Sequence, residues 1–128
     1  MFDHVGLNVQ DFERSRAFYQ EALEPLGLKE RAVFEESKSA GFGPEGKYGF
    51  WIVQREPYGT GTHVAFSAPD RAAVDAFHAA GVAAGGIDNG APGIRERYHS
   101  AYYAAFVHDP DGNNIGLMRE APQGLDRG

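Results

Sequence analysis

The sequence predicts a single α+β domain made of two tandem βαβββ modules, whose mixed sheet forms a cup with the helices on its outer face. The first observation is an internal repeat at an offset of 59 residues (63 minus 4), in which two 24-residue segments align without a gap. The second is that each copy reads as a strand, a helix and then further strands. The third is the length of 128 residues, which suits one compact domain. The positions that agree are His4 and His63, Val5 and Val64, Asp11 and Asp70, Ala17 and Ala76, Phe18 and Phe77, and Gly27 and Gly86.

The first module covers about residues 1–58. Residues 2–9 alternate loosely between apolar and polar side chains, which predicts a strand. Asp11 then offers an N-cap to a helix whose apolar stripe ends before Pro25 and Gly27. Turn signals separate three further predicted strands, at about residues 28–36, 38–43 and 48–54.

The second module covers about residues 59–120 and repeats the order. Residues 62–68 predict a strand, and Pro69 and Asp70 open a helix that ends at the Gly85–Gly86 pair. The segment "GGIDNGAPGI" is interpreted as a loop that leads to a short strand near residues 97–99. A hairpin follows, in which "AYYAAFVH" turns through "DPDGN" into "NIGLMRE", and residues 121–128 form a polar tail.

A period near 59 residues is too long for a solenoid, so the repeat indicates two equivalent halves about a pseudo-twofold axis. Each half buries one sheet face under its helix, and the other face lines a shared hollow. Strand alternation puts His4 on the same face as Gly6 and Asn8, and His63 occupies the equivalent position in the second copy. We therefore expect the two imidazoles to project into the hollow.

Composition excludes several classes of function. The net charge of −6 and the scattered Lys and Arg residues argue against nucleic acid as a partner. No apolar run is long enough to span a membrane, and "MFDHVGLNV" does not read as a secretory signal, so a cytoplasmic location is expected. Because the chain has no cysteine, His, Asp and Glu are the strong metal ligands that it offers.

The two "HV" strands, the Asp-capped helices and the closing stretch "YHSAYYAAFVHDPDGNNIG" resemble the vicinal oxygen chelate superfamily, which includes glyoxalase I, bleomycin resistance proteins and extradiol dioxygenases. The resemblance implies paired βαβββ modules, often in a homodimer. In the metal-using members it implies a divalent ion (Zn, Ni, Mn or Fe) bound by His on the opening strands and by carboxylates on the closing strands. It therefore implies that His4 and His63 are metal ligands.

The closing strands depart from that pattern. Gly116 stands where the metal-using members carry Glu, and residues 48–54 offer Phe50, Trp51 or Ile52 at the corresponding position. Two neutral imidazoles alone make a weak site, because catalytic zinc sites generally use three protein ligands. A third ligand would have to come from His99, Glu35 or Glu36, and a bound metal is the less favoured interpretation.

The segment "IRERYHSAYY" combines donors and aromatic rings beside the predicted hollow. We expect Arg95 and Arg97 to bind ligand, together with Phe50 and Trp51, which would stack on a planar molecule. The candidate catalytic residues are His99, as a base near neutral pH, and Tyr102 and Tyr103, of which only one can face the hollow.

Two functional hypotheses follow. The first is a small-molecule-handling protein with a ligand cup, metal-independent or weakly metal-dependent. The alternative is a divalent-metal-dependent lyase, isomerase or dioxygenase that acts on a substrate with vicinal oxygens. Acidic composition favours a cationic ligand, whereas Arg95 and Arg97 favour an anion, so the sequence leaves the sign of the ligand charge and the question of catalysis open.

Overall fold

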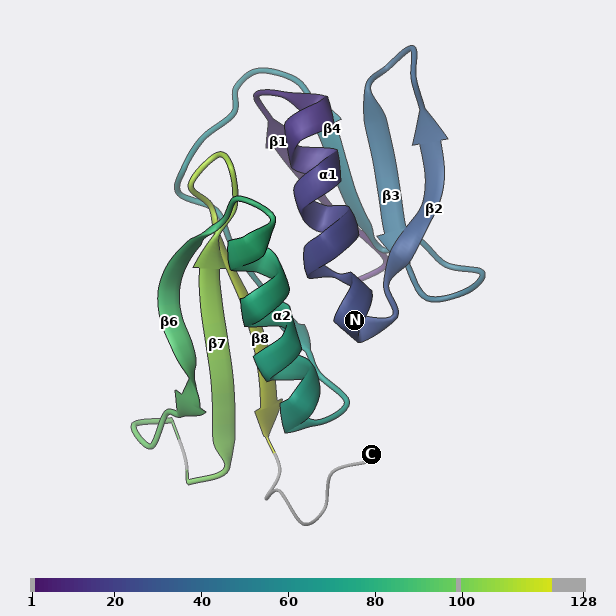
Figure 1. Cartoon of the computed structure of the whole chain (residues 1–128). Helices are drawn as coiled ribbons and strands as arrows, with labels where there is room; N and C mark the ends of the chain where they lie inside the picture. Colours follow the sequence, from purple (N-terminus) through teal and green to yellow (C-terminus); the bar gives the residue numbers. More distant parts are fainter. Residues whose placement is uncertain (1, 99, 121–128) are drawn as a thin grey trace.

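The computed structural model describes residues 2–98 and 100–120. Two copies of a βαβββ unit follow one another along the chain, as Figure 1 shows. The elements of the first unit are β1 (Val5–Val9), α1 (Phe12–Ala22), the short 3₁₀ helix η1 (Glu24–Leu26), β2 (Lys29–Phe34), β3 (Ser39–Gly43) and β4 (Phe50–Gln54). Those of the second are β5 (His63–Ser67), α2 (Arg71–Ala83), β6 (Ile87–Ile94), β7 (Tyr102–His108) and β8 (Asn114–Glu120).

Each unit forms its own four-stranded mixed sheet. The strand order is β1-β4-β3-β2 in sheet 1 and β5-β8-β7-β6 in sheet 2. The opening strand of each sheet pairs in parallel with the closing strand, and the other pairs are antiparallel. The predicted α+β class and the tandem βαβββ modules are therefore confirmed.

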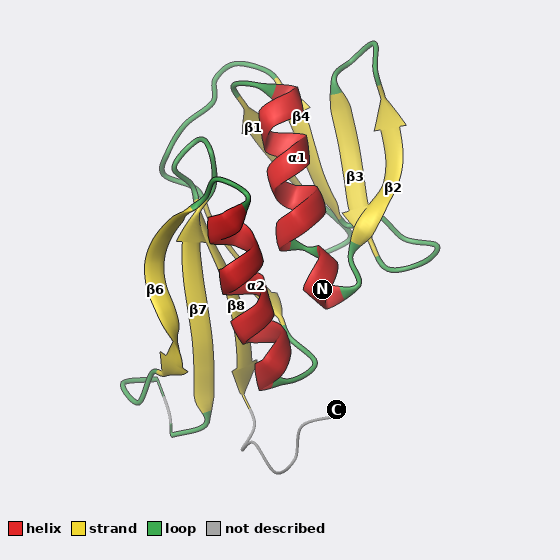
Figure 2. Ribbon diagram, in the orientation of Figure 1, coloured by secondary structure: helices red, strands yellow, loops and turns green. Residues whose placement is uncertain are grey.

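Both helices begin at the predicted aspartates. The Asp11 carboxylate accepts a hydrogen bond from the Arg14 backbone N–H (3.1 Å), and the Asp70 carboxylate accepts one from the Ala73 N–H (2.8 Å). Each cap satisfies a backbone donor that the first turn of the helix leaves without a partner. The helices lie side by side and contact each other in front of the two sheets (Figure 2).

The prediction for the segment after α2 was wrong. Residues 87–94 form strand β6, and residues 96–98 form a turn; residue 99, the end of the predicted short strand, lies outside the described residues. The pairing of β6 with β7 shifts register twice, between Asp88 and Gly90 and again between Gly90 and Gly93. Gly90 has a φ of 151°, which favours glycine, so a loop-like composition here serves an irregular strand.

One hydrophobic core joins the two units. Phe50 of sheet 1 and Phe66 of sheet 2 pack edge to face, with ring centroids 5.3 Å apart. Gly86, which follows α2, lies close to helix α1, since a Cβ at this position would approach the Phe18 ring to 2.7 Å. The modules are therefore fixed against each other by burial as well as by the chain that links them.

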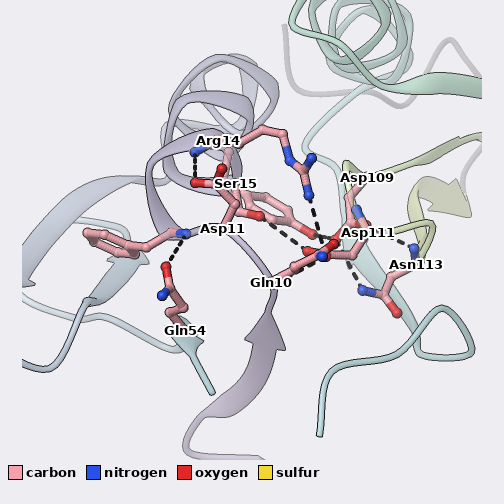
Figure 3. Close-up of polar contacts among 10 residues, drawn as sticks. Gln10, Asp11, Arg14, Ser15, Gln54, Asp109, Asp111 and Asn113 are labelled. Atoms are coloured by element: carbon pink, nitrogen blue, oxygen red, sulfur yellow. Dashed lines mark hydrogen bonds and ion pairs between the residues drawn. The ribbon is translucent and has the colours of Figure 1, made fainter. Parts of the chain in front are cut away.

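A buried polar network also crosses between the modules (Figure 3). Asp109, only 3% exposed, accepts hydrogen bonds from the Tyr19 hydroxyl (2.6 Å) and from the backbone N–H groups of Asp111 (2.9 Å) and Asn113 (2.8 Å). Asp111 in turn accepts a hydrogen bond from the Ser15 hydroxyl at 3.3 Å. The "DPDGN" segment is thus a turn, as predicted, and its two carboxylates bind helix α1 of the other module.

Burial raises the pKa of Tyr19 well above its ordinary value, and the neighbouring Asp109 carboxylate raises it further. Tyr19 therefore stays protonated and acts as the donor. Replacing it with Phe leaves the Asp109 carboxylate buried with one donor fewer.

We predict that Tyr19→Phe lowers the free energy of unfolding by about 1–3 kcal/mol, the cost of leaving a buried polar group short of a partner. The measurement is urea denaturation followed by circular dichroism. Tyr58→Phe is the matched control, since Tyr58 is 41% exposed. Equal stability of the Tyr19→Phe variant and the control would contradict the role given to the network.

Candidate functional site

Each sheet has one face covered by its helix and one face directed away from the helix. We call the second face the outer face of the sheet; it is the face that was predicted to line the hollow. On β1, Leu7 and Val9 are buried while Gly6 is exposed. On β5, Val64 and Phe66 pack against the core, while His63 is exposed. The alternation predicted for the opening strands is therefore present in both copies.

His63 lies on the outer face of sheet 2 with a defined orientation. Its Nδ1 is 2.9 Å from the backbone carbonyl oxygen of Asn114, so Nδ1 carries the hydrogen and donates it. Its ring centroid is 6.0 Å from that of Phe106. The Nε2 atom of the neutral ring is left as an acceptor.

His4 lies just before β1 and is highly exposed. Its Nδ1 is 2.8 Å from a carboxylate oxygen of Asp3, and this hydrogen bond lowers the pKa of Asp3. His4 also lines a cavity of about 290 Å³ between the modules, together with Phe50 and the 64–66 segment of β5. Phe50 is nearly fully buried on the helix side of sheet 1, so it contributes to this cavity and not to the outer face.

The outer face of sheet 1 carries an aromatic cluster centred on Trp51. The Trp51 ring stacks on Phe34 (6.0 Å between centroids, 9° between planes) and meets the edge of Tyr48 at 5.6 Å. It also covers Gly41 on the neighbouring strand, where a Cβ would lie 2.8 Å from ring atoms. Only glycine fits beneath the indole.

The outer face of sheet 2 has a similar arrangement in which Phe106 covers Gly116. A Cβ on Gly116 would lie 2.6 Å from two atoms of the Phe106 ring. Phe106 on β7 is the direct cross-strand neighbour of Gly116 on β8. We call this arrangement, in either sheet, a ring-on-glycine pair.

Strand register shows that the two pairs occupy equivalent places. Trp51 lies between Gly6 and Gly41, and Gly116 lies between Ala65 and Phe106. The 59-residue offset makes Gly6 and Ala65 equivalent, so Trp51 corresponds to Gly116. Each module has one ring over one glycine, and the strand that supplies the ring is exchanged between the modules.

The ring-on-glycine pairs occupy the places on the closing strands where the family resemblance implies carboxylate metal ligands. The two closing-strand positions that would supply carboxylates are an indole in one module and a covered glycine in the other. Among residues 2–98 and 100–120, no group of three or more His, Asp and Glu side chains is placed to hold a metal ion. Of the alternative third ligands, Glu35 faces Arg16 at 3.5 Å, and His99 lies outside the described residues. The described residues do not fit a His and carboxylate metal centre.

Arg95 lies against Phe106 on the outer face of sheet 2. Its guanidinium carbon is 5.7 Å from the ring centroid. Two of its nitrogens donate to backbone carbonyls of β6, at 3.0 Å to Gly93 and 2.8 Å to Ala91. The guanidinium is thus held in place by its own strand.

The tyrosines of β7 point to opposite faces. Tyr102 shares the outer face with Phe106, and its ring lies 4.8 Å from Tyr98, on which Arg97 stacks at 5.2 Å. Tyr103 lies on the helix side, where its hydroxyl donates to Asp75 of α2 at 2.5 Å. Burial raises the pKa of both hydroxyls above their ordinary value, so both stay protonated at neutral pH.

The structure therefore brings together His63, Arg95 and Tyr102 on one face and leaves the other candidates elsewhere. Trp51 is on sheet 1, His4 and Phe50 line the cavity, and Arg97 lies in the turn beyond β6. Phe106, which sequence reasoning missed, is the residue that His63 and Arg95 share. Its signal in the sequence was an aromatic residue facing a glycine across a hairpin.

Comparison with known proteins agrees with this architecture. The model of the Glyoxalase/Bleomycin resistance protein/Dioxygenase superfamily matches residues 1–117. A solved glyoxalase/bleomycin resistance protein from Albidiferax ferrireducens T118 is 34% identical, with a TM-score of 0.81 over 93% of this chain and 98% of that one. The chain belongs to the Glyoxalase/Bleomycin resistance protein/Dioxygenase superfamily.

More distant structures share the fold. A mutant of the fosfomycin resistance protein FosX from Listeria monocytogenes, solved with Mn(II) and 1S,2S-dihydroxypropylphosphonic acid, is 21% identical, with a TM-score of 0.66 over 91% of this chain and 87% of that one. A glyoxalase-related enzyme from Fulvimarina pelagi is 18% identical, with a TM-score of 0.72 over 100% of this chain and 95% of that one. No match was found among curated proteins. Within the described residues, neither helix has the length and apolar character needed to cross a membrane.

We predict that Gly116→Ala destabilises the protein by about 1–3 kcal/mol, because the new methyl group collides with the Phe106 ring. In a Phe106→Ala background the same substitution should cost far less, since the two changes are directly coupled. Both effects are measured by urea denaturation.

Gly6→Ala is the matched control. Gly6 lies on an outer face, a Cβ there meets nothing within 4 Å, and the equivalent residue of the second module is already Ala65. If Gly116→Ala and Gly6→Ala had the same effect on stability, the ring-on-glycine packing would be wrong.

Proposed function

We propose that this protein binds a small organic molecule on the outer face of sheet 2 without a resident metal ion. The observation that carries the proposal is the ring-on-glycine pair in each module. Where a metal-using relative would place a carboxylate, this chain has an aromatic surface. Such a surface favours an apolar or planar ligand instead of a hydrated cation.

The polar groups around Phe106 suit a ligand site. Small-molecule sites combine apolar walls with a few placed hydrogen-bonding groups. Here the wall is the Phe106 ring, with His63 and Arg95 beside it. Tyr102 lies on the same face, four residues earlier on β7.

The cavity beside His4 is a second candidate location, with apolar walls that include Phe42 and Phe50 and with polar side chains from Asp3, His4 and Lys47. We favour the face of sheet 2 because its arginine is held in place over an aromatic ring.

The alternative is a divalent-metal-dependent lyase, isomerase or dioxygenase. The orientation of His63 favours it, since an Nδ1 bonded to a carbonyl oxygen leaves Nε2 available to a metal. His4 likewise bonds through Nδ1. Against it stands the number of ligands, because two imidazoles fall short of the three protein ligands of a catalytic zinc site.

We further propose that the protein is a homodimer. Many members of the family are dimers, and the outer face of sheet 1 leaves large aromatic side chains in solvent, with Phe34 55% and Tyr48 48% exposed. A second copy would cover this surface. Analytical ultracentrifugation of the wild type and of a Phe34→Ser variant tests this, and a monomeric wild type would overturn it.

The functional proposal is tested by a thermal-shift screen with methylglyoxal, its glutathione adduct, catechol and bleomycin, each in EDTA and in Mn²⁺. We expect at least one compound to raise the melting temperature equally in both buffers. His4→Ala should give the same shift as the wild type, because His4 is outside the proposed site.

A shift that EDTA abolishes and Mn²⁺ restores would overturn the metal-free proposal in favour of the metal-dependent alternative. A metal-independent shift that is lost in His4→Ala would instead place the ligand in the cavity beside His4 and overturn the site on sheet 2. Absence of any shift in both buffers would count against small-molecule binding by this set of chemistries and against the proposal.

A further inference from the structure

The outer face of sheet 2 carries the positive charge of Arg95. Arg95 is half-buried, and among the residues that the structure describes no carboxylate lies within ion-pair distance of its guanidinium. Two other arginines are paired with carboxylates: Arg16 binds Glu30 at 2.7 Å, and Arg14 faces Asp111 at 3.8 Å. Arg95 instead bonds only to neutral groups, so its positive charge is not cancelled by a direct partner.

Strand β6 holds the Arg95 guanidinium in place. A Cβ on Gly90 would lie 3.1 Å from one terminal guanidinium nitrogen of Arg95, and a Cβ on Gly93 would lie 3.2 Å from the other. The two glycines therefore leave room for the guanidinium. Two backbone carbonyls and the Phe106 ring fix its position. An arginine has five N–H donors, so this arrangement leaves donors for a ligand. Because the side chain is already held in place, ligand binding would cost it little further conformational entropy.

Three further polar side chains lie on the same face. His63 lies against the Phe106 ring from β5, and its Nε2 is not used by the hydrogen bond to the Asn114 carbonyl. Tyr102 lies on β7 with its hydroxyl protonated at neutral pH, and burial raises its pKa further. Glu120, opposite Tyr102 on β8, is the acidic neighbour at that end of the face.

We propose, on the basis of the function proposed above, that the ligand is an organic oxyanion: a carboxylate or phosphonate attached to a planar apolar group. The anionic group contacts the Arg95 guanidinium, and the apolar group lies on Phe106. A planar guanidinium matches the geometry of both oxyanions. The net charge of −6 works against anion binding, so affinity for the anion has to come from the local charge of Arg95.

The test uses four probes of one shape and different charge: benzoate, phenylphosphonate, neutral benzamide and cationic benzamidine. Each is titrated into ¹⁵N-labelled wild-type protein in EDTA, and binding is followed by amide chemical shifts. We expect benzoate or phenylphosphonate to shift residues of β6 and β7, and benzamide and benzamidine to bind about tenfold more weakly or worse, as for loss of a charge-assisted hydrogen bond. Comparing the two anions separates a carboxylate site from a phosphonate site.

Arg95→Gln should weaken binding of the preferred anion about tenfold or more, whereas Arg55→Gln, which removes an exposed charge outside the site, should leave it unchanged. Amide spectra of both variants verify that they are folded. The anion's affinity should also fall as salt is added.

Failure of the anion inference can be distinguished from failure of the metal-free proposal. Benzamide binding as tightly as benzoate in EDTA, or an anion whose binding Arg95→Gln leaves unchanged, overturns the anion inference while metal-free ligand binding stands. Anion binding that depends on Arg95 but requires Mn²⁺ leaves the anion inference and overturns the metal-free proposal. If none of the four probes binds, the inference is wrong.

Discussion

The packing of an aromatic ring over a glycine on the outer face of each sheet is the constraint on which this account depends. The constraint is steric. The Phe106 ring needs the space that any side chain at position 116 would occupy, and Trp51 needs the space above Gly41. Because the fold puts potential metal-binding positions at these places, the same contacts determine which chemistry the surface can carry.

The two modules keep the same backbone while exchanging the roles of individual strands. Trp51 is supplied by the closing strand of the first module, and Phe106 by the strand before the closing strand of the second. The modules also differ in polarity around the ring. Trp51 is flanked by the aromatic residues Phe34 and Tyr48, whereas Phe106 is flanked by His63 and Arg95. The two outer faces of the repeat thus differ in chemistry, one being aromatic around its ring and the other polar.

Local sequence signals were sufficient for much of the fold. Asp11 and Asp70 marked the helix starts, because a capping carboxylate acts within three residues. Alternation alone also assigned the outer-face positions of the opening strands. Strand β6 was missed because its glycines serve register shifts and the contact with Arg95, and neither is visible in a local pattern.

The site itself was less predictable, because it depends on which strands become neighbours. Tyr102 and Tyr103 could be separated only once the register of β7 was known. The covering of Gly116 by Phe106 joins positions ten residues apart across a hairpin, and the burial of Phe50 depends on Phe66 of the other module. Arg95 stood out in the sequence as a charge, but its lack of an ion-pair partner among the described residues became visible only in three dimensions.

The central claim is that an aromatic surface has replaced the metal centre, and titration calorimetry with Mn²⁺ and Zn²⁺ on protein stripped of metal tests it most directly. The account predicts no saturable one-to-one binding of either ion to the wild type. A stoichiometric, tight isotherm that disappears in His63→Ala would contradict it, because a metal would then be held despite the covered glycine and the indole.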